Sequence, residues 1–174
     1  GDRVAVLHHA PCGSCYYCMH GQEPLCDQYR RTTVDPGGFA EYIRVIRQLV
    51  EQSVVKIPDD VTYEEATMTE PTACALTAIS RSRVALGDTV LVIGGGPLGL
   101  LNAQLARCAG ASQVILSDHN DFRVQMAKNL EIDHAFNARD VNVEEKVKEL
   151  TELRGADLVV VAVASTEAVH QCLK

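Results

Sequence analysis

The stretch VLVIGGGPLGL, residues 90–100, decides the fold of this chain. It places Gly94, Gly96 and Gly99 in the pattern G-x-G-x-x-G, after an apolar run and before a helical pattern. In a strand–turn–helix unit the first glycine permits the tight turn, the second lets a pyrophosphate approach the backbone, and the third lets helix and strand pack closely. The N–H groups at the amino end of the helix then face the phosphates. The stretch therefore predicts a nucleotide-binding turn.

From residue 88 onward, strand and helix patterns alternate along the chain. Apolar runs that predict strands cover residues 88–94, 112–118, 134–138 and 157–165. Helical patterns cover residues 97–111, 121–132 and 142–155, and a further helix starts in 166–174. Strands that are apolar throughout and joined by helices form a parallel sheet covered on both faces. The predicted fold class is therefore α/β, with a Rossmann-type parallel sheet.

Asp118 stands at the end of the second of these strands, 19 residues past Gly99. A carboxylate there accepts hydrogen bonds from the adenosine ribose hydroxyls and repels a 2′-phosphate, which favours NAD over NADP. Arg123 could serve a phosphate, but we expect it to flank the adenine because Asp118 holds the discriminating position. S-adenosylmethionine is the main alternative ligand. The other alternative is a glycine turn that binds no ligand.

The region before the glycine turn has a different character. Residues 2–7, 37–45 and 49–60 predict strands in a β-rich and loop-rich segment. Residues 62–84 have a helical pattern, with Thr62 and Glu65 in capping-box register. We expect Pro71 to break or kink this helix. The predicted domains are residues 1–62 and residues 63–174.

Four cysteines lie within residues 12–26, with the spacing Cys12-x2-Cys15-x2-Cys18-x7-Cys26. Two residues between ligands let consecutive thiolates point at one ion, and four thiolates leave no open coordination position. This lobe predicts a structural zinc site. A redox pair, disulfides and an iron–sulfur cluster are the alternatives, although Asp27 stands where the ferredoxin run has proline.

The other cysteines and the net charge indicate which cellular compartment and which partners the sequence favours. The other three of the seven cysteines, Cys74, Cys108 and Cys172, are scattered through apolar, helical segments, which indicates reduced thiols and a cytoplasmic protein. A net charge of −7 argues against a nucleic-acid or anionic-membrane surface. No apolar run approaches the roughly 20 residues of a membrane span.

Together these motifs resemble the zinc-containing medium-chain alcohol dehydrogenases, and within them the sorbitol (polyol) and threonine dehydrogenase branch. The matching stretches are GDRV, CGSCYYCMHGQEPLC, GGFAEYI, KIPDDVTYEEATMTEP, LGDTVLVIGGGPLGL and SDHNDFRVQMAKNL. The resemblance implies a GroES-like catalytic domain carrying the zinc lobe, followed by a Rossmann domain. It also implies NAD contacts along the glycine turn, Pro97 and Leu98 included, and at Asp118.

The family oxidises a secondary alcohol or polyol by passing a hydride to NAD, with a second, catalytic zinc at the alcohol oxygen. Of the family's catalytic set, only Glu70 in TEP is present, as a metal ligand or a holder of its water. Cys74 falls one helical turn beyond it and is expected to be a packed core thiol.

The expected zinc ligands upstream and the last two strands of the dinucleotide fold are missing, so the chain resembles an internal fragment without turnover of its own. A non-catalytic zinc- and nucleotide-binding module is therefore the alternative function. The family commonly forms homo-oligomers, dimers or tetramers, and the alcohol substrate cannot be read from these residues.

Overall fold

The computed structural model describes residues 1–172, and the chain divides into two compact units, Gly1–Glu70 and Pro71–Lys174. The first unit contains β1 (Val4–Val6), α1 (Tyr16–Met19), the 3-10 helix η1 (Glu23–Leu25), α2 (Asp27–Arg31), α3 (Arg47–Ser53), β2 (Val54–Lys56) and α4 (Tyr63–Ala66). Helix α5 (Thr69–Ser82) contains the division. The second unit continues with β3 (Thr89–Ile93), α6 (Pro97–Cys108), β4 (Gln113–Asp118), α7 (Asp121–Asn129), β5 (His134–Asn137), α8 (Val143–Leu150), β6 (Leu158–Val161) and α9 (Thr166–Gln171).

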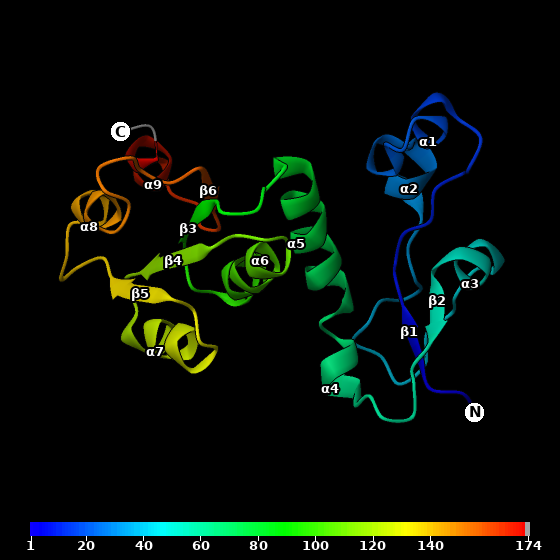
Figure 1. Ribbon diagram of the computed structural model, residues 1–174. Coiled ribbons are helices and arrows are strands. Elements are labelled where there is room, and N and C mark those ends of the chain that lie inside the picture. Colours follow the sequence, from blue (N-terminus) through cyan, green and yellow to red (C-terminus); the bar gives the residue numbers. More distant parts are fainter. Residues whose placement is uncertain (173–174) are drawn as a thin grey trace. The chain divides into compact units, whose positions relative to one another are not determined.

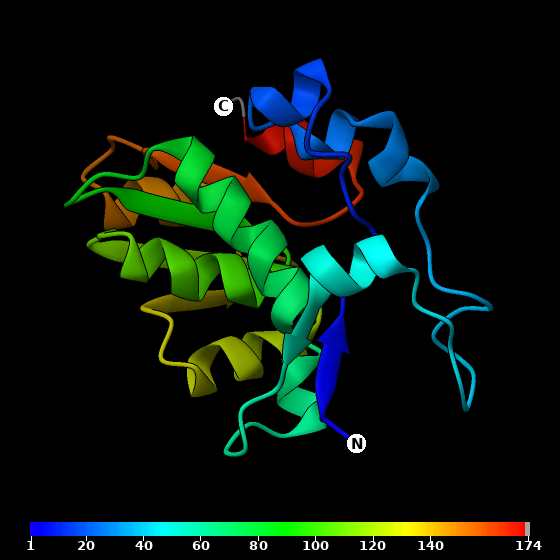
Figure 2. The ribbon, with the colours of Figure 1, turned by 90° about the vertical axis from the view of Figure 1, so that its right-hand side faces the viewer.

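The first unit is built on one antiparallel strand pair, in which Val4 faces Lys56 and Val6 faces Val54. One of the predicted strands is wrong, and another is confirmed only in part. Residues 37–45 form a loop with a single bridge, Asp35 to Arg44, and Figure 2 shows this loop running between α2 and α3. The predicted strand 49–60 begins only at Val54, because residues 49–53 belong to α3.

The helical pattern of residues 62–84 is interrupted, but before Pro71 rather than at it. Helix α4 starts with the expected capping box, in which Thr62 Oγ1 accepts from the Glu65 N–H at 3.1 Å and Glu65 Oε2 accepts from the Thr62 N–H at 2.8 Å. Helix α5 begins two residues before Pro71. Proline is tolerated there because the first turn of a helix has no intrahelical acceptor for its missing N–H.

The second unit holds a four-stranded parallel sheet in the order β5-β4-β3-β6, as the alternation of strand and helix patterns predicts. All five residues of β3 are buried, because this strand has neighbours on both edges and helices on both faces. The predicted last helix, residues 166–174, is observed as α9 up to Gln171, and residues 173–174 lie outside the described part of the chain.

Two apolar clusters fix the layers of this unit. One packs α5, α6 and α7 on one face of the sheet, through residues such as Ile79, Ala103 and Val124. The other packs α8 and α9 on the opposite face through Val147 and Ala168. Figure 1 shows α6 and α7 on one side of the strands and α8 and α9 on the other. The carboxyl ends of the strands, where the glycine turn lies, therefore open between two helical layers.

None of the helices described for residues 1–172 combines the length and the apolarity that crossing a bilayer requires.

Candidate zinc lobe and nucleotide-binding turn

The four cysteines of the lobe converge in space. Their Sγ atoms all lie within 4.8 Å of one another, with 3.9 Å between Cys12 and Cys18 and 3.5 Å between Cys15 and Cys18. A tetrahedral zinc ion with Zn–S bonds of about 2.3 Å would separate its ligands by about 3.8 Å. The donor set and its spacing therefore fit one zinc ion.

The local backbone explains this convergence. Gly13, with φ +74°, turns the chain after the first ligand, and Cys15 caps the short helix α1. Gly21, with φ +68°, reverses the chain toward Cys26, which is 1% exposed and caps α2. A left-handed φ is accessible to glycine without strain, so glycine favours both turns.

Backbone N–H groups also point at the sulfur atoms. The N–H groups of Ser14 and Cys15 lie 3.5 and 3.3 Å from Cys12 Sγ, and they lower the pKa of that thiol to about 6. The Cys12 N–H lies 3.4 Å from Cys26 Sγ and, with the Tyr29 N–H, lowers the pKa of Cys26. Partial burial and then the Cys15 thiol raise the pKa of Cys18 to about 12. Four thiols this close cannot all ionise without a countercharge, and a divalent cation would supply it.

In the second unit, the glycine turn is closed by contacts that only glycine permits. Gly94 has φ +108° and donates its N–H to the Ser117 carbonyl at 2.7 Å. A Cβ on Gly94 would press against Val163, and a Cβ on Gly99 would overlap the Gly94 carbonyl. These two glycines therefore let α6 lie directly against the carboxyl ends of the strands.

Gly96 has a different surrounding. It is the N-cap of α6, it offers no side chain to the first-turn N–H groups, and a Cβ there would meet nothing within 4 Å. Pro97 and Leu98 follow it in the first turn of α6, and both are exposed. The turn thus presents an open helix N-terminus, which is the arrangement that suits an anion such as a pyrophosphate.

Asp118 is held beside this turn by backbone donors. One of its carboxylate oxygens accepts from the Gly95 N–H at 2.7 Å and the other from the Asn120 N–H at 2.8 Å, while Arg123 Nη1 lies at 3.4 Å. Burial would raise the pKa of Asp118, but the two N–H donors and Arg123 outweigh it and lower the pKa. The carboxylate is therefore ionised at neutral pH, although the residue is only 8% exposed.

A hollow of about 440 Å³ opens at this place, lined by residues 118–123 and Arg139. The sequence prediction missed three residues of this neighbourhood: Gly95, Asn120 and Arg139. Asn120 caps α7 by accepting from the N–H groups of Phe122 and Arg123, and an asparagine just before a helical pattern is a signal that could have found it. Arg139 has no comparable local signal, because it comes from the loop after a different strand.

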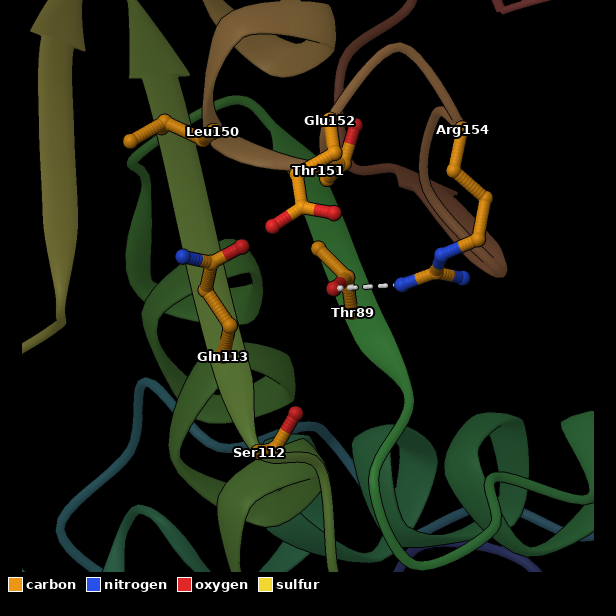
Figure 3. Close-up of a pocket in the computed structure, with 7 residues that line it drawn as sticks. All are labelled: Thr89, Ser112, Gln113, Leu150, Thr151, Glu152 and Arg154. Carbon is orange, nitrogen blue, oxygen red and sulfur yellow. Dashed lines mark hydrogen bonds between the residues drawn. The ribbon is translucent and has the colours of Figure 1, made fainter.

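A second hollow, of about 390 Å³, lies at the opposite, amino edge of the sheet (Figure 3). Arg154 Nη2 lies 3.3 Å from Thr89 Oγ1 there, and Thr151 Oγ1 donates to the Val147 carbonyl at 2.7 Å. Ser112 Oγ donates to the Gly87 carbonyl at 2.7 Å. The Arg154 and Ser112 contacts join the starts of strands to neighbouring loops, and the Thr151 contact closes the end of α8.

Glu70 is exposed and stands in the first turn of α5. Within residues 1–172, the four cysteines form the one group of three or more potential metal ligands, and Glu70 is outside it. A metal role for Glu70 therefore stays a prediction from the resemblance. The prediction that Cys74 is a packed core thiol is wrong, because Cys74 is exposed in this structure.

Comparisons with known proteins agree with both halves of the chain. Residues 1–59 match the family described as alcohol dehydrogenase GroES-like domain, and residues 97–174 match zinc-binding dehydrogenase. A sorbitol dehydrogenase from Halalkalibacterium halodurans is 37% identical over 98% of this chain and 50% of its own length. An L-threonine 3-dehydrogenase from Pyrococcus abyssi is 35% identical over 100% of this chain and 49% of its own.

Solved structures give the same result. A zinc-binding dehydrogenase from Sinorhizobium meliloti, bound to NADP, has a TM-score of 0.82 and 30% identity, over 97% of this chain and 49% of its own. An alcohol dehydrogenase from Escherichia coli, complexed with NADH, has a TM-score of 0.82 and 28% identity, over 99% of this chain and 50% of its own.

This chain thus spans about half the length of the relatives it matches. Its two matched segments follow each other in the same order as the two units of the structure. The chain belongs to the zinc-containing medium-chain dehydrogenase family, and it is similar to the sorbitol and threonine dehydrogenases within it.

Proposed function

We propose that this chain is part of an NAD-dependent zinc dehydrogenase that oxidises a secondary alcohol or polyol. The observation that carries the proposal is the ionised, buried carboxylate of Asp118 beside the open glycine turn. A carboxylate in this position can accept hydrogen bonds from ribose hydroxyls, and it disfavours a ligand with a 2′-phosphate. The solved relatives, one bound to NADH and one to NADP, support a nicotinamide dinucleotide as the cofactor class.

The proposed NAD contacts come from three places on the carboxyl edge of the sheet. The backbone of Gly94, Gly96 and Gly99, together with Pro97 and Leu98, would surround the pyrophosphate. Asp118 would bind the adenosine ribose. Arg123, which is half-exposed beside it, would flank the adenine.

The proposed metal roles are separate. Cys12, Cys15, Cys18 and Cys26 would hold a structural zinc, and Glu70 would ligate a catalytic metal or hold its water. The chemistry that such cofactors would supply is Lewis-acid activation of an alcohol, which loses its hydroxyl proton to solvent, and acceptance of the hydride from the carbinol carbon, which leaves a ketone. The alcohol is the substrate class, and we further propose a homo-oligomeric assembly and a cytoplasmic location.

Calorimetric titration of the chain with NAD, NADP and S-adenosylmethionine tests the nucleotide assignment. We expect NAD to bind more tightly than NADP, with no binding of S-adenosylmethionine. Binding of S-adenosylmethionine in place of NAD would contradict the proposal.

The catalytic assignment is tested in the whole protein that contains this chain. Replacing Glu70→Gln should lower polyol oxidation by about tenfold or more, since ligands and their supporting groups commonly have effects of this size, while leaving NAD affinity unchanged. Full activity in this variant would remove Glu70 from the site.

A second candidate function is a zinc- and nucleotide-binding module without catalysis. It is favoured by the fact that, in the described residues, metal-ligating side chains gather only at the four cysteines. A catalytic zinc needs about three protein ligands. Polyol-dependent NADH formation by the whole protein would decide against this second candidate.

A further inference from the structure

Arg3, in the stretch GDRV, joins the strand pair of the first unit to the loop that leads into α4. Its Nη2 donates to the Val61 carbonyl at 2.5 Å, and its Nη1 lies 3.3 and 3.5 Å from the carbonyls of Pro58 and Asp59. The guanidinium carbon lies 4.7 Å from the centre of the Tyr63 ring, a cation–π contact with the first residue of α4. One side chain thus binds along the whole connection from β2 to α4.

The backbone of Arg3 is fixed as well. Its carbonyl accepts the Ile57 N–H at 2.9 Å, directly after β2, and the next residue, Val4, starts β1. A planar guanidinium with five N–H donors can hold several carbonyls at once, and its rigid fork loses little freedom for each bond formed. Arg3 therefore holds the loop in place against the strand pair.

Beyond this loop, further hydrogen bonds connect α4 to Glu70. The capping box closes the start of α4. Thr67 Oγ1 donates to the Glu64 carbonyl at 2.6 Å. Thr69 Oγ1 donates to the Ala66 carbonyl at 2.8 Å, which closes the turn between α4 and α5. Glu70 is the next residue, in the first turn of α5 and still within the first unit. A displacement of the loop would therefore be passed on to Glu70.

We propose that Arg3 is a positioning residue for the dehydrogenase reaction, because it sets where the Glu70 carboxylate stands relative to the strand pair of the first unit. The inference rests on the proposed role of Glu70. Arg3 acts through Glu70 and not on the substrate. A misplacement of about 1 Å can lower a catalysed rate by about 100-fold. Loss of the Arg3 contacts should therefore lower turnover, while the glycine turn of the second unit keeps its affinity for NAD.

The first test is amide hydrogen exchange, measured on this chain. We expect Arg3→Gln to raise exchange in residues 58–70 by about tenfold, because hydrogen bonds from a charged donor are lost there, and to leave the sheet of the second unit unchanged. The matched control is Lys56→Gln. It removes the ion pair of Lys56 Nζ with Asp2 Oδ1, at 3.3 Å, which also joins the two strands of the pair but involves no residue of the loop. Equal exchange in the two variants would overturn the anchoring role of Arg3.

The second test measures turnover in the whole protein that contains this chain. Arg3→Gln should lower kcat for polyol oxidation by about tenfold, with the Kd for NAD unchanged, and Lys56→Gln should leave kcat unchanged. In Glu70→Gln protein, adding Arg3→Gln should lower kcat by less than about twofold, because two residues that act as a unit have non-additive effects. If Arg3→Gln does not fold, Arg3→Lys takes its place. That variant keeps the charge but not the planar fork, so a loss of about threefold is expected.

The kinetic results separate this inference from the proposed function. Unchanged kcat in a folded Arg3→Gln protein, together with impaired Glu70→Gln protein, would overturn the inference alone. An equal loss of kcat in both backgrounds would also overturn it, since Arg3 would then act independently of Glu70. Full activity in Glu70→Gln protein would remove the proposed role of Glu70, and the inference would fail with it.

Discussion

At the scale of single residues, Gly96 and Gly99 differ in what an added methyl group would meet. At Gly99 a Cβ would overlap the backbone of Gly94, whereas at Gly96 it would enter open space. Gly99→Ala should therefore reduce the free energy of unfolding by about 1–3 kcal/mol, as overpacking does. Gly96→Ala should change it by less than about 0.5 kcal/mol.

The same two substitutions distinguish an effect on folding from an effect on NAD binding. Gly96→Ala puts a methyl group where the pyrophosphate approaches, so NAD affinity should fall about tenfold or more through lost charge-assisted hydrogen bonds. Denaturant titration and calorimetry measure the two effects. Unchanged NAD binding in Gly96→Ala would place the phosphates elsewhere.

Cys15 and Cys108 make a second residue-scale comparison. We expect one zinc per chain, bound by four thiolates, in protein washed with chelator and reloaded. Cys15→Ser should lose the metal because one ligand of the closed set is missing, and Cys108→Ser, in the last turn of α6, should retain it. Elemental analysis decides: bound iron, or no metal with all four thiols intact, would contradict the assignment.

At the scale of elements, the amino edge of the parallel sheet depends on aspartates that join neighbouring strands. Asp157, just before β6, accepts from the Thr89 N–H of β3 at 2.8 Å and pairs with Arg154. Asp133, just before β5, accepts from the Val114 N–H of β4 at 2.7 Å and pairs with Arg107 at 2.8 Å. Each carboxylate thereby ties the start of one strand to its neighbour.

This arrangement predicts a pH dependence of stability. Arg154, and then the Thr89 N–H, lower the pKa of Asp157. A carboxyl whose pKa is lower in the folded state contributes stability above its unfolded pKa of about 3.9 and loses it as the pH falls through the folded value. Asp157→Asn should therefore reduce the free energy of unfolding by about 1 kcal/mol at pH 7.

The check is a set of urea titrations between pH 2 and pH 7, comparing Asp157→Asn with the unmodified chain. The two unfolding curves should converge at the acid end. A difference that stays constant over this range would show that the carboxylate charge is not involved.

The elements also show where local sequence suffices. The strands and helices after residue 88 were predicted because each has its own apolar period and the parallel sheet buries both faces. The strand expected at residues 37–45 failed because a strand needs a partner, and the pattern alone does not supply one. Residues 49–53 are helical with Leu49 and Ser53 buried at i,i+4 spacing, and Arg47 pairs with Glu51 at 2.6 Å on the outside.

The candidate site likewise has residues that local sequence predicts and residues that it does not predict. The spacing of the four cysteines and the glycine turn are local features, so their sequence intervals already indicated what the structure brings together. Gly95 and Arg139 could not be found, because the first acts through its backbone N–H on Asp118, and the second reaches the hollow from the loop after β5.

At the scale of the whole molecule, the two units have very different cores. Among the described residues, only four buried apolar side chains belong to the first unit, namely Ala10, Cys26, Leu49 and Ile57, and one of them is a proposed metal ligand. The second unit has an apolar cluster on each face of its sheet. A unit of about 70 residues with so small a core is the kind that a structural metal stabilises.

Removal of the metal should therefore destabilise the first unit and leave the stability of the second unit unchanged. We expect a strong chelator to lower the unfolding temperature of residues 1–70 and to leave the transition of residues 71–174 within about 2 °C of its original position. Differential scanning calorimetry measures both transitions. A single transition that shifts as a whole would show that the units unfold together, and no shift at all would contradict a structural zinc.

The division into two units also gives the chain a built-in optical probe. All five tyrosines, Tyr16, Tyr17, Tyr29, Tyr42 and Tyr63, lie in the first unit, and the sequence contains no tryptophan. Tyrosine emission and the tyrosine band of the near-ultraviolet absorbance therefore come from the zinc-lobe unit alone. Far-ultraviolet dichroism is dominated by the longer helices after residue 69. One unlabelled sample, followed at two wavelengths, can thus report separately on the unit that holds the cysteines and the unit that holds the glycine turn.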